Sequence, residues 1–518
     1  RATLAFLSDT LAAAAPEQAM RRDVSVRDLL DQARRKLDEK ALDPQVRQSV
    51  QRMLGRLYQS LGDNVSAVAL LEAGTRGVIP RQREDALTLA DDLVVYADAL
   101  TNLERLPETL HVAEQAVALR ERFAPDDPEQ QLRGMAHLTL GHVDKYGFEW
   151  CRKRAEAALA LSKRMASPPV DIVLEVYSNL SEIANYQNDR SRTLEISREG
   201  LAFADAHHVA PNSPLRLPLL KNLVNGLILN GRPDEAERLL RKTLAMGEET
   251  GGYGPASLTV LNQVLGDMLM QQGRYREALE VMMRTLELSS QAGVGPRGLA
   301  MVLSNMAVVE LRFGDYAGAL DHARQAMQRL TEDKVSPDDM FSRTIRRLHA
   351  RVLAANGAYM EAASQVQQLL VASRRLDGEQ SEEYASLMAE QLMIYVQRGD
   401  LERGLPLLAQ VRDLFHKRGF PPEHEQFAKL FGVEAAFDRL RGDSLAAEQH
   451  QRVALQGLQS NNSALDVAIC KSLLAGDLMN RDKAQARRLL AEALPVMEAS
   501  LMPSERTLIK AKALASKL

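Results

Sequence analysis

A short pattern that recurs about every 42 residues dominates this sequence. Each copy has an apolar segment, a tight turn with Gly or Asn, and a second segment that opens with an aromatic or small residue and an alanine. The clearest turn glycines are Gly62, Gly231, Gly273, Gly314, Gly357, Gly399 and Gly442. From Gly231 onward they are 41 to 43 residues apart. Such a period indicates an array of repeats, each of which buries its apolar face only against its neighbours.

The residues around each turn explain why one copy should form a pair of helices. A glycine at the end of a helix can adopt the left-handed conformation that terminates it. Alanine stands five residues after the glycine in five copies, where a small side chain lets two helices approach closely: Ala67, Ala236, Ala278, Ala319 and Ala362. Helix-forming residues dominate the composition, and no long alternating strand pattern occurs. The sequence therefore predicts an all-α, right-handed superhelical solenoid of about eleven helix–turn–helix repeats.

The repeat resembles the tetratricopeptide (TPR) motif. Leu54-Gly55-x-x-Tyr58, followed by Gly62 and Ala67, matches that motif well, and similar copies begin at Leu265 and Asn305. The usual TPR has about 34 residues, so each helix should be about one turn longer here, as in the long-helix repeats of large bacterial regulatory proteins. The resemblance covers roughly residues 44–500. It implies a repeat array over 43–502 and a C-terminal capping helix over 503–518.

Residues 1–42 do not fit the period, and the simplest interpretation is a pair of lead-in and capping helices. This region contains three short motifs, namely Phe6-Leu7, Pro16-Glu17 and the run from Asp23 to Asp31. These motifs also resemble a segment of bacterial Ser/Thr kinases of the eukaryotic type, xanthomonad kinases included. In those proteins the segment follows the membrane span. The resemblance implies that this chain is the periplasmic sensor region of such an inner-membrane receptor kinase, in contact with the membrane only through an upstream transmembrane helix.

Composition excludes several other classes of protein. The 65 basic and 69 acidic residues nearly balance, whereas nucleic-acid binding requires a clustered basic face. No apolar run long enough to span a bilayer occurs. The two cysteines, Cys151 and Cys470, have no metal-ligand spacing, and no kinase motif is present. We therefore expect no catalytic residues, no metal site, no cofactor and no enzyme activity in this chain.

A ligand-binding surface can be placed from the resemblance, because the first helix of each TPR pair lines the concave face. Positions ten and six residues before each turn should point into the groove: Arg52 and Arg56, Lys221 and Asn225, Gln263 and Asp267, Arg347 and Arg351, and, before the weaker turn at Asn188, Glu182. Lys221, Asn225, Gln263 and Asp267 would form a polar ladder for an extended peptide. Arg347 and Arg351 could hold a carboxylate.

These observations favour a non-catalytic sensor that binds a protein or peptide in its concave groove and regulates an attached Ser/Thr kinase. Two other functions stay open. One is an inducer-binding helical-repeat domain of a bacterial transcription activator, and the other is a free-standing TPR scaffold. A cytoplasmic location and homodimerisation also stay open at this stage.

Overall fold

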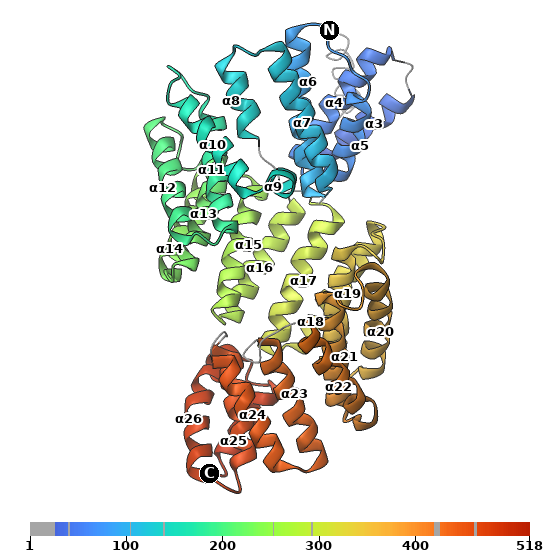
Figure 1. Ribbon diagram of the computed structural model, residues 1–518, viewed down its shortest axis with the longest axis vertical. Helices are drawn as coiled ribbons and strands as arrows, with labels where there is room; N and C mark the ends of the chain where they lie inside the picture. Colours follow the sequence, from blue (N-terminus) through green and yellow to red (C-terminus); the bar gives the residue numbers. More distant parts are fainter. Residues whose placement is uncertain are drawn as a thin grey trace. The chain divides into compact units, whose positions relative to one another are not determined.

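The computed structural model describes residues 26–39, 42–103, 105–137, 140–251, 253–291, 294–418, 425–459 and 464–518. Every regular element in these ranges is a helix, and none is a strand (Figure 1). The predicted all-α repeat architecture is confirmed. Over the same residues, the pairs from α4/α5 to α25/α26 make eleven repeats, with α8, α9 and α10 together forming one of them.

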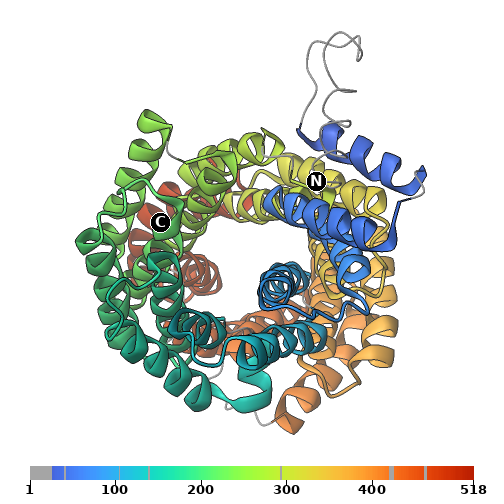
Figure 2. The same ribbon diagram turned by 90° about the horizontal axis from the view of Figure 1, so that it is seen from above.

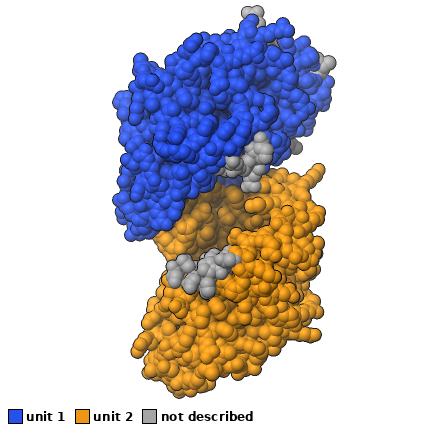
Figure 3. All heavy atoms as spheres, in the orientation of Figure 1, with its two compact units in different colours: residues 1–261, 288–295 blue, residues 262–287, 296–518 orange. Residues whose placement is uncertain are grey.

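The chain divides into two compact units (Figure 3). Unit 1 contains residues 1–261 and 288–295, and unit 2 contains residues 262–287 and 296–518. The helices of unit 1 are α3 (Val26–Glu39), α4 (Pro44–Ser60), α5 (Asn64–Thr75), α6 (Arg83–Asn102), α7 (Leu106–Phe123), α8 (Pro128–Ala136), α9 (Leu140–Tyr146), α10 (Phe148–Ser162), α11 (Val170–Tyr186), α12 (Arg190–Ala206), the short 3-10 helix η1 (Pro214–Arg216), α13 (Leu217–Leu229) and α14 (Pro233–Thr250).

Two helices contribute residues to both units, namely α15 (Pro255–Gln271) and α16 (Tyr275–Gln291). The remaining helices of unit 2 are α17 (Pro296–Phe313), α18 (Tyr316–Glu332), α19 (Met340–Ala355), α20 (Tyr359–Leu376), α21 (Glu382–Arg398), α22 (Leu401–Lys417), α23 (Glu425–Arg441), α24 (Ser444–Gln459), α25 (Ala464–Leu478), α26 (Lys483–Ser500) and α27 (Arg506–Ala515). None of the helices that the structure describes is long and apolar enough to cross a membrane.

The turn between the two helices of a repeat is built as the sequence predicts. Gly62 has a φ of 79°, and the other six turn glycines have φ values between 70° and 94°. The next residue, Asp63, caps α5 by accepting a hydrogen bond from the backbone N–H of Ser66. The five predicted alanines, of which Ala67 is the first, are all fully buried. Glycine, cap and alanine therefore bring the paired helices into close contact.

One repeat of unit 1 departs from the regular hairpin. Its first helix is divided into α8, which ends at Ala136, and α9, which begins at Leu140. His137 follows α8 and lies between carboxylates of α6 and α11. Its Nε2 atom is 3.8 Å from Asp98 Oδ1, and its Nδ1 atom is 3.5 Å from Glu175 Oε1. The repeat period alone does not reveal this division.

The N-terminal helix α3 lies alongside α4 (both blue in Figures 1 and 2). Its apolar residues Leu30, Ala33 and Leu37 are buried, and Tyr58 donates a hydrogen bond of 2.6 Å to Asp31. Helix α3 therefore covers the first repeat. The remainder of the kinase-like segment, residues 1–25, lies outside the described residues.

Unit 2 contains a contact between residues that are far apart in the sequence, which we call the C-terminal clasp. The clasp consists of Met502, Glu505 and Arg506 packed on the α17–α18 turn. The Met502 N–H donates a 2.8 Å hydrogen bond to the carbonyl of Phe313, and Tyr316 donates one of 2.9 Å to Glu505. The Arg506 guanidinium lies 5.4 Å from the centre of the Tyr316 ring. Helices α17 to α27 thus return to their starting point within one unit.

Candidate binding surface

The first predicted pair of ligand-binding residues has partners inside the protein. Arg52 and Arg56 project from α4 toward Asp92 of α6, the first helix of the next repeat. Arg52 Nε lies 2.8 Å from Asp92 Oδ2, and Arg56 Nε contacts Asp92 Oδ1. Asp92 is only 2% exposed. Both guanidinium groups therefore join two repeats, and neither is free for a ligand.

Three other predicted residues of unit 1 lie on first helices without such partners. Lys221 and Asn225 are on α13 and Glu182 is on α11; Lys221 is exposed and the other two are partly exposed. In the part of the chain that the structure describes, no hydrogen bond or ion pair engages these side chains. Their polar groups are available to another molecule.

Asparagines beside this row have a different role. Asn222 donates a 3.1 Å hydrogen bond to the carbonyl of Ser178 in the preceding repeat, and Asn179 donates one of 2.8 Å to the carbonyl of Ala136. Each asparagine joins the first helices of adjacent repeats. The first helices α11 and α13 therefore carry asparagines that hold the repeats together beside polar side chains that are unpaired.

The predicted ladder is divided between the two units, with Lys221 and Asn225 in unit 1. Gln263 and Asp267 lie on the part of α15 that belongs to unit 2. Neither side chain has a partner among the described residues. Asp267 is exposed, yet burial raises the pKa of its carboxyl group. The carboxyl group of Asp267 is therefore open to another molecule even though neighbouring protein disfavours its charged form.

The remaining two predicted residues belong to a charged cluster on α19 and α21, which consists of Arg347, Arg351, Glu383 and Glu390. Arg347 Nη1 lies 2.9 Å from Glu383 Oε2, and Arg347 Nε lies 3.6 Å from Glu390 Oε1. The second oxygen of Glu390, Oε2, is buried and accepts no hydrogen bond. Burial raises the pKa of Glu390 to about 7, although Arg347 and Arg351 act to lower it.

Arg351 is the unpaired member of this α19–α21 cluster. Its side chain is exposed, and within the described part of the chain it makes no hydrogen bond or ion pair. Burial nevertheless lowers the pKa of its guanidinium, and the positive charges of Arg312 and Arg347 act in the same direction. Arg312 itself is paired with Asp466 at 2.8 Å. Arg351 is therefore an exposed cation with no anion of its own among the described residues.

The two glutamates of the cluster were missed at the sequence level. Counting ten and six residues back from Gly399 selects Ala389 and Met393 on α21 and passes over Glu390. A usable signal was present, because Glu383 and Glu390 are seven residues apart and residues with that spacing share one face of a helix. Counting fixed positions in the repeat misses both glutamates, whereas the seven-residue spacing of acidic residues along α21 indicates them.

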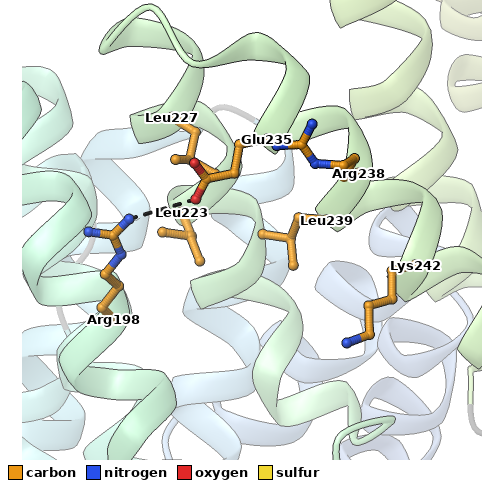
Figure 4. A pocket seen from close by; sticks show the side chains of 7 residues that line it. All are labelled: Arg198, Leu223, Leu227, Glu235, Arg238, Leu239 and Lys242. Atoms are coloured by element: carbon orange, nitrogen blue, oxygen red, sulfur yellow. Dashed lines mark ion pairs between the residues drawn. The ribbon is translucent and has the colours of Figure 1, made fainter.

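A small hollow in unit 1 lies between α12, α13 and α14 (Figure 4). Its volume is about 270 Å³, and Leu223, Leu227 and Leu239 line it. Arg198 and Glu235 face each other across it at 3.9 Å. Pockets that enclose a small molecule usually have about 300–1,000 Å³. The hollow is therefore too small to enclose a ligand of ordinary size.

The structure offers little for metal or thiol chemistry. Across the described ranges, no group of three or more His, Cys, Asp or Glu side chains is placed to hold a metal ion. Cys151 and Cys470 are both buried and free, and burial raises the pKa of both thiols. The thiolate is the reactive form of cysteine, so neither residue has the environment of a nucleophile.

Comparison with known proteins identifies the repeats. The model of the MalT-like TPR region family matches residues 90–421. The chain belongs to the MalT-like TPR family. The recognised TPR resemblance is thereby confirmed, and TPR repeats of this kind are typically non-catalytic. Nothing in the match bears on a kinase domain.

The MalT-like TPR chain is also similar to individual proteins. It is 32% identical over 278 residues to human mitochondrial tetratricopeptide repeat protein 19, an alignment that spans 52% of this chain and 68% of the relative. Among solved structures, the apo form of RapI superposes with a TM-score of 0.53 at 12% identity, over 72% of this chain and 98% of RapI. A Rap protein complexed with Competence and Sporulation Factor gives a TM-score of 0.43 at 13% identity, over 67% and 99% of the two chains. At 12% identity the similarity to RapI supports the fold alone.

Proposed function

We propose that this MalT-like TPR chain is a non-catalytic sensor and interaction region that binds an extended protein or peptide along the first helices of its repeats. The observation that carries the proposal is the presence of unpaired polar side chains on first helices within each unit. These are Lys221 and Asn225 in unit 1 and, separately, Gln263, Asp267 and Arg351 in unit 2. Charged side chains elsewhere are extensively paired, as Asp92 and its two arginines illustrate. Unpaired donors and acceptors on a concave surface suit the backbone and side chains of an extended peptide.

A binding experiment with a random peptide library tests the proposal. Fluorescent peptides selected on the wild-type chain are titrated against the double variant Lys221→Ala/Asn225→Ala, with binding followed by anisotropy. We expect the dissociation constant to rise between about fivefold and about 150-fold, because loss of one or two hydrogen bonds to a ligand costs about 1–3 kcal/mol.

The matched control is Lys153→Ala. Lys153 is also an exposed lysine, with 71% of its side chain accessible, but it lies on α10, the second helix of its repeat. Its replacement should leave the affinity unchanged. If the selected peptides bind the double variant as tightly as the wild type, the first helices of unit 1 are not the binding surface.

We further propose that the chain is the periplasmic sensor region of a receptor-type Ser/Thr kinase, with ligand occupancy regulating the kinase. What supports this is the sequence resemblance of the segment from Phe6 to Asp31, most of which lies outside the described residues. The coding sequence upstream of Arg1 tests it directly. A kinase domain followed by an apolar run of about 20 residues is the expected result, and any other upstream domain contradicts the proposal.

The second candidate is an inducer-binding regulatory region of a bacterial transcription activator. The MalT-like family match over residues 90–421 is the observation that favours it, because repeats of this family occur in regulators. An upstream nucleotide-binding domain with a P-loop would decide for this candidate. A cytoplasmic location would then replace the periplasmic one.

A further inference from the structure

We infer that Arg351 receives a carboxylate of the bound peptide, and that Glu390 takes up a proton when that carboxylate arrives. The inference rests on the proposed peptide-binding function and assigns the chemistry of one subsite. It concerns only the α19–α21 cluster, which lies entirely in unit 2.

The first observation is the lack of a counter-ion for Arg351. Arg347, one turn earlier on α19, is paired with Glu383 and approaches Glu390. Arg351 has no such partner although Glu390 is near enough to act on it electrostatically. An arginine holds a carboxylate through its paired N–H donors, and those of Arg351 are exposed and make no bond to any described residue. The free position beside Arg351 is therefore the anion site.

The second observation is the incomplete bonding of Glu390. Its Oε1 atom is 3.6 Å from Arg347, while its Oε2 atom is buried without a hydrogen-bond partner. A buried, unsatisfied carboxylate oxygen strongly disfavours the charged form. An additional carboxylate at Arg351 would add a second negative charge close to Glu390. Protonation of Glu390 removes both the buried charge and the repulsion.

The net charge of the cluster favours a carboxylate over a doubly charged phosphate. With both glutamates ionised, the two arginines and two glutamates balance. Once Glu390 is protonated, the cluster carries one positive charge, which a single carboxylate neutralises. A phosphate dianion would leave the site negative. The other charges near the cluster are Arg312 on α17 and its partner Asp466 on α25, which cancel as an ion pair.

The direction and size of the pH dependence follow from this arrangement. The pKa of Glu390 is about 7 in the free protein. If the carboxylate binds only when Glu390 is protonated, the competent fraction falls about tenfold between roughly pH 6 and pH 8. Affinity for an acidic peptide should fall by the same factor. A free peptide carboxylate has a pKa near 3.5 and does not titrate in this range.

The experiment compares three random peptide libraries that contain no Asp, Glu or His and have acetylated N-termini. One has a free C-terminal carboxylate, one is amidated, and one is amidated with a single phosphoserine. Binding to the wild-type chain is measured by anisotropy at about pH 6 and pH 8. The same measurements are made on Arg351→Ala, on Glu390→Gln, and on Arg403→Ala, an exposed arginine of the second helix α22, as the matched control.

For the wild type and Arg403→Ala, we expect the acid-ended library to bind best at the lower pH and to lose about tenfold in affinity at the higher pH. Arg351→Ala should reduce its binding to the level of the amidated library. Glu390→Gln, which mimics the protonated side chain, should bind the acid-ended library tightly at both pH values. These three results together support the inference.

Several results would overturn it. Equal binding of the acid-ended and amidated libraries to the wild type removes the carboxylate site, and preferential binding of the phosphoserine library replaces it with a phosphate site. Full pH dependence in Glu390→Gln removes the role of Glu390. If none of the libraries binds the wild type at either pH, the proposed peptide-binding function itself fails, which is a different outcome from loss of the carboxylate preference.

Discussion

Replacing Tyr316 by phenylalanine tests whether the C-terminal clasp is a stable part of unit 2. The hydroxyl of Tyr316 donates a 2.9 Å hydrogen bond to Glu505, a residue that is only 5% exposed. A hydrogen bond to a charged group contributes about 1.5–3 kcal/mol. Tyr316→Phe keeps the ring beside Arg506 and removes only this bond, so the clasp should be weakened by about 2 kcal/mol.

Hydrogen exchange measured by mass spectrometry locates that loss. Opening of the clasp exposes the amide of Met502, which donates a hydrogen bond to the carbonyl of Phe313. A loss of about 2 kcal/mol corresponds to roughly thirtyfold faster exchange through local opening. We expect this acceleration in peptides that cover residues 501–515 and in the α17–α18 turn.

The matched control is Tyr359→Phe. Tyr359 begins α20 as Tyr316 begins α18, one repeat later, but its hydroxyl has no partner in the described part of the chain. This variant should exchange like the wild type. The clasp would be refuted as an energetic contact if Tyr316→Phe left residues 501–515 unchanged, or if it accelerated exchange equally throughout α19 to α22.

Two further predictions concern charges buried between helices. Asp92→Ala should lower the free energy of unfolding by about 3 kcal/mol because it leaves the guanidinium groups of Arg52 and Arg56 without their carboxylate; an unchanged urea midpoint would contradict this. The hydrogen bond to Glu310 is the main cause of the raised pKa of His322. The ion pair therefore stabilises the fold fully below the ordinary imidazole pKa of about 6.5. This stabilisation is lost as the pH rises through the raised pKa of His322. The difference in unfolding free energy between the wild type and His322→Gln, measured by urea titration, should therefore shrink at alkaline pH. A difference that stays constant with pH would show that the His322–Glu310 pair is not its cause.

The hairpins could be predicted from the sequence because their causes are local. The backbone freedom of Gly62, the cap formed by Asp63 and the small size of Ala67 act within one turn, and the same residue types recur in each copy. A period of this kind also fixes the architecture, since stacked hairpins bury their apolar faces only against each other.

The binding surface was less predictable because its properties depend on pairing between repeats. Arg56 and Arg351 both stand six residues before a turn glycine, yet Arg56 has Asp92 as a partner in the next repeat and Arg351 has none. The partner is about forty residues away in the sequence, and the period does not specify whether it is acidic. The clasp is more remote still, since 189 residues separate Tyr316 from Glu505, and no local pattern signals it.

The clasp also has a consequence for how unit 2 is made. Repeat arrays usually fold from neighbour to neighbour, so each hairpin can become native soon after it leaves the ribosome. The α17–α18 turn cannot, because its partner at Glu505 is synthesised 189 residues after Tyr316. Until then the turn remains uncovered. Closing so long a loop is slow, and the last event in the biogenesis of unit 2 should be the arrival of α27 at a turn that was translated long before it.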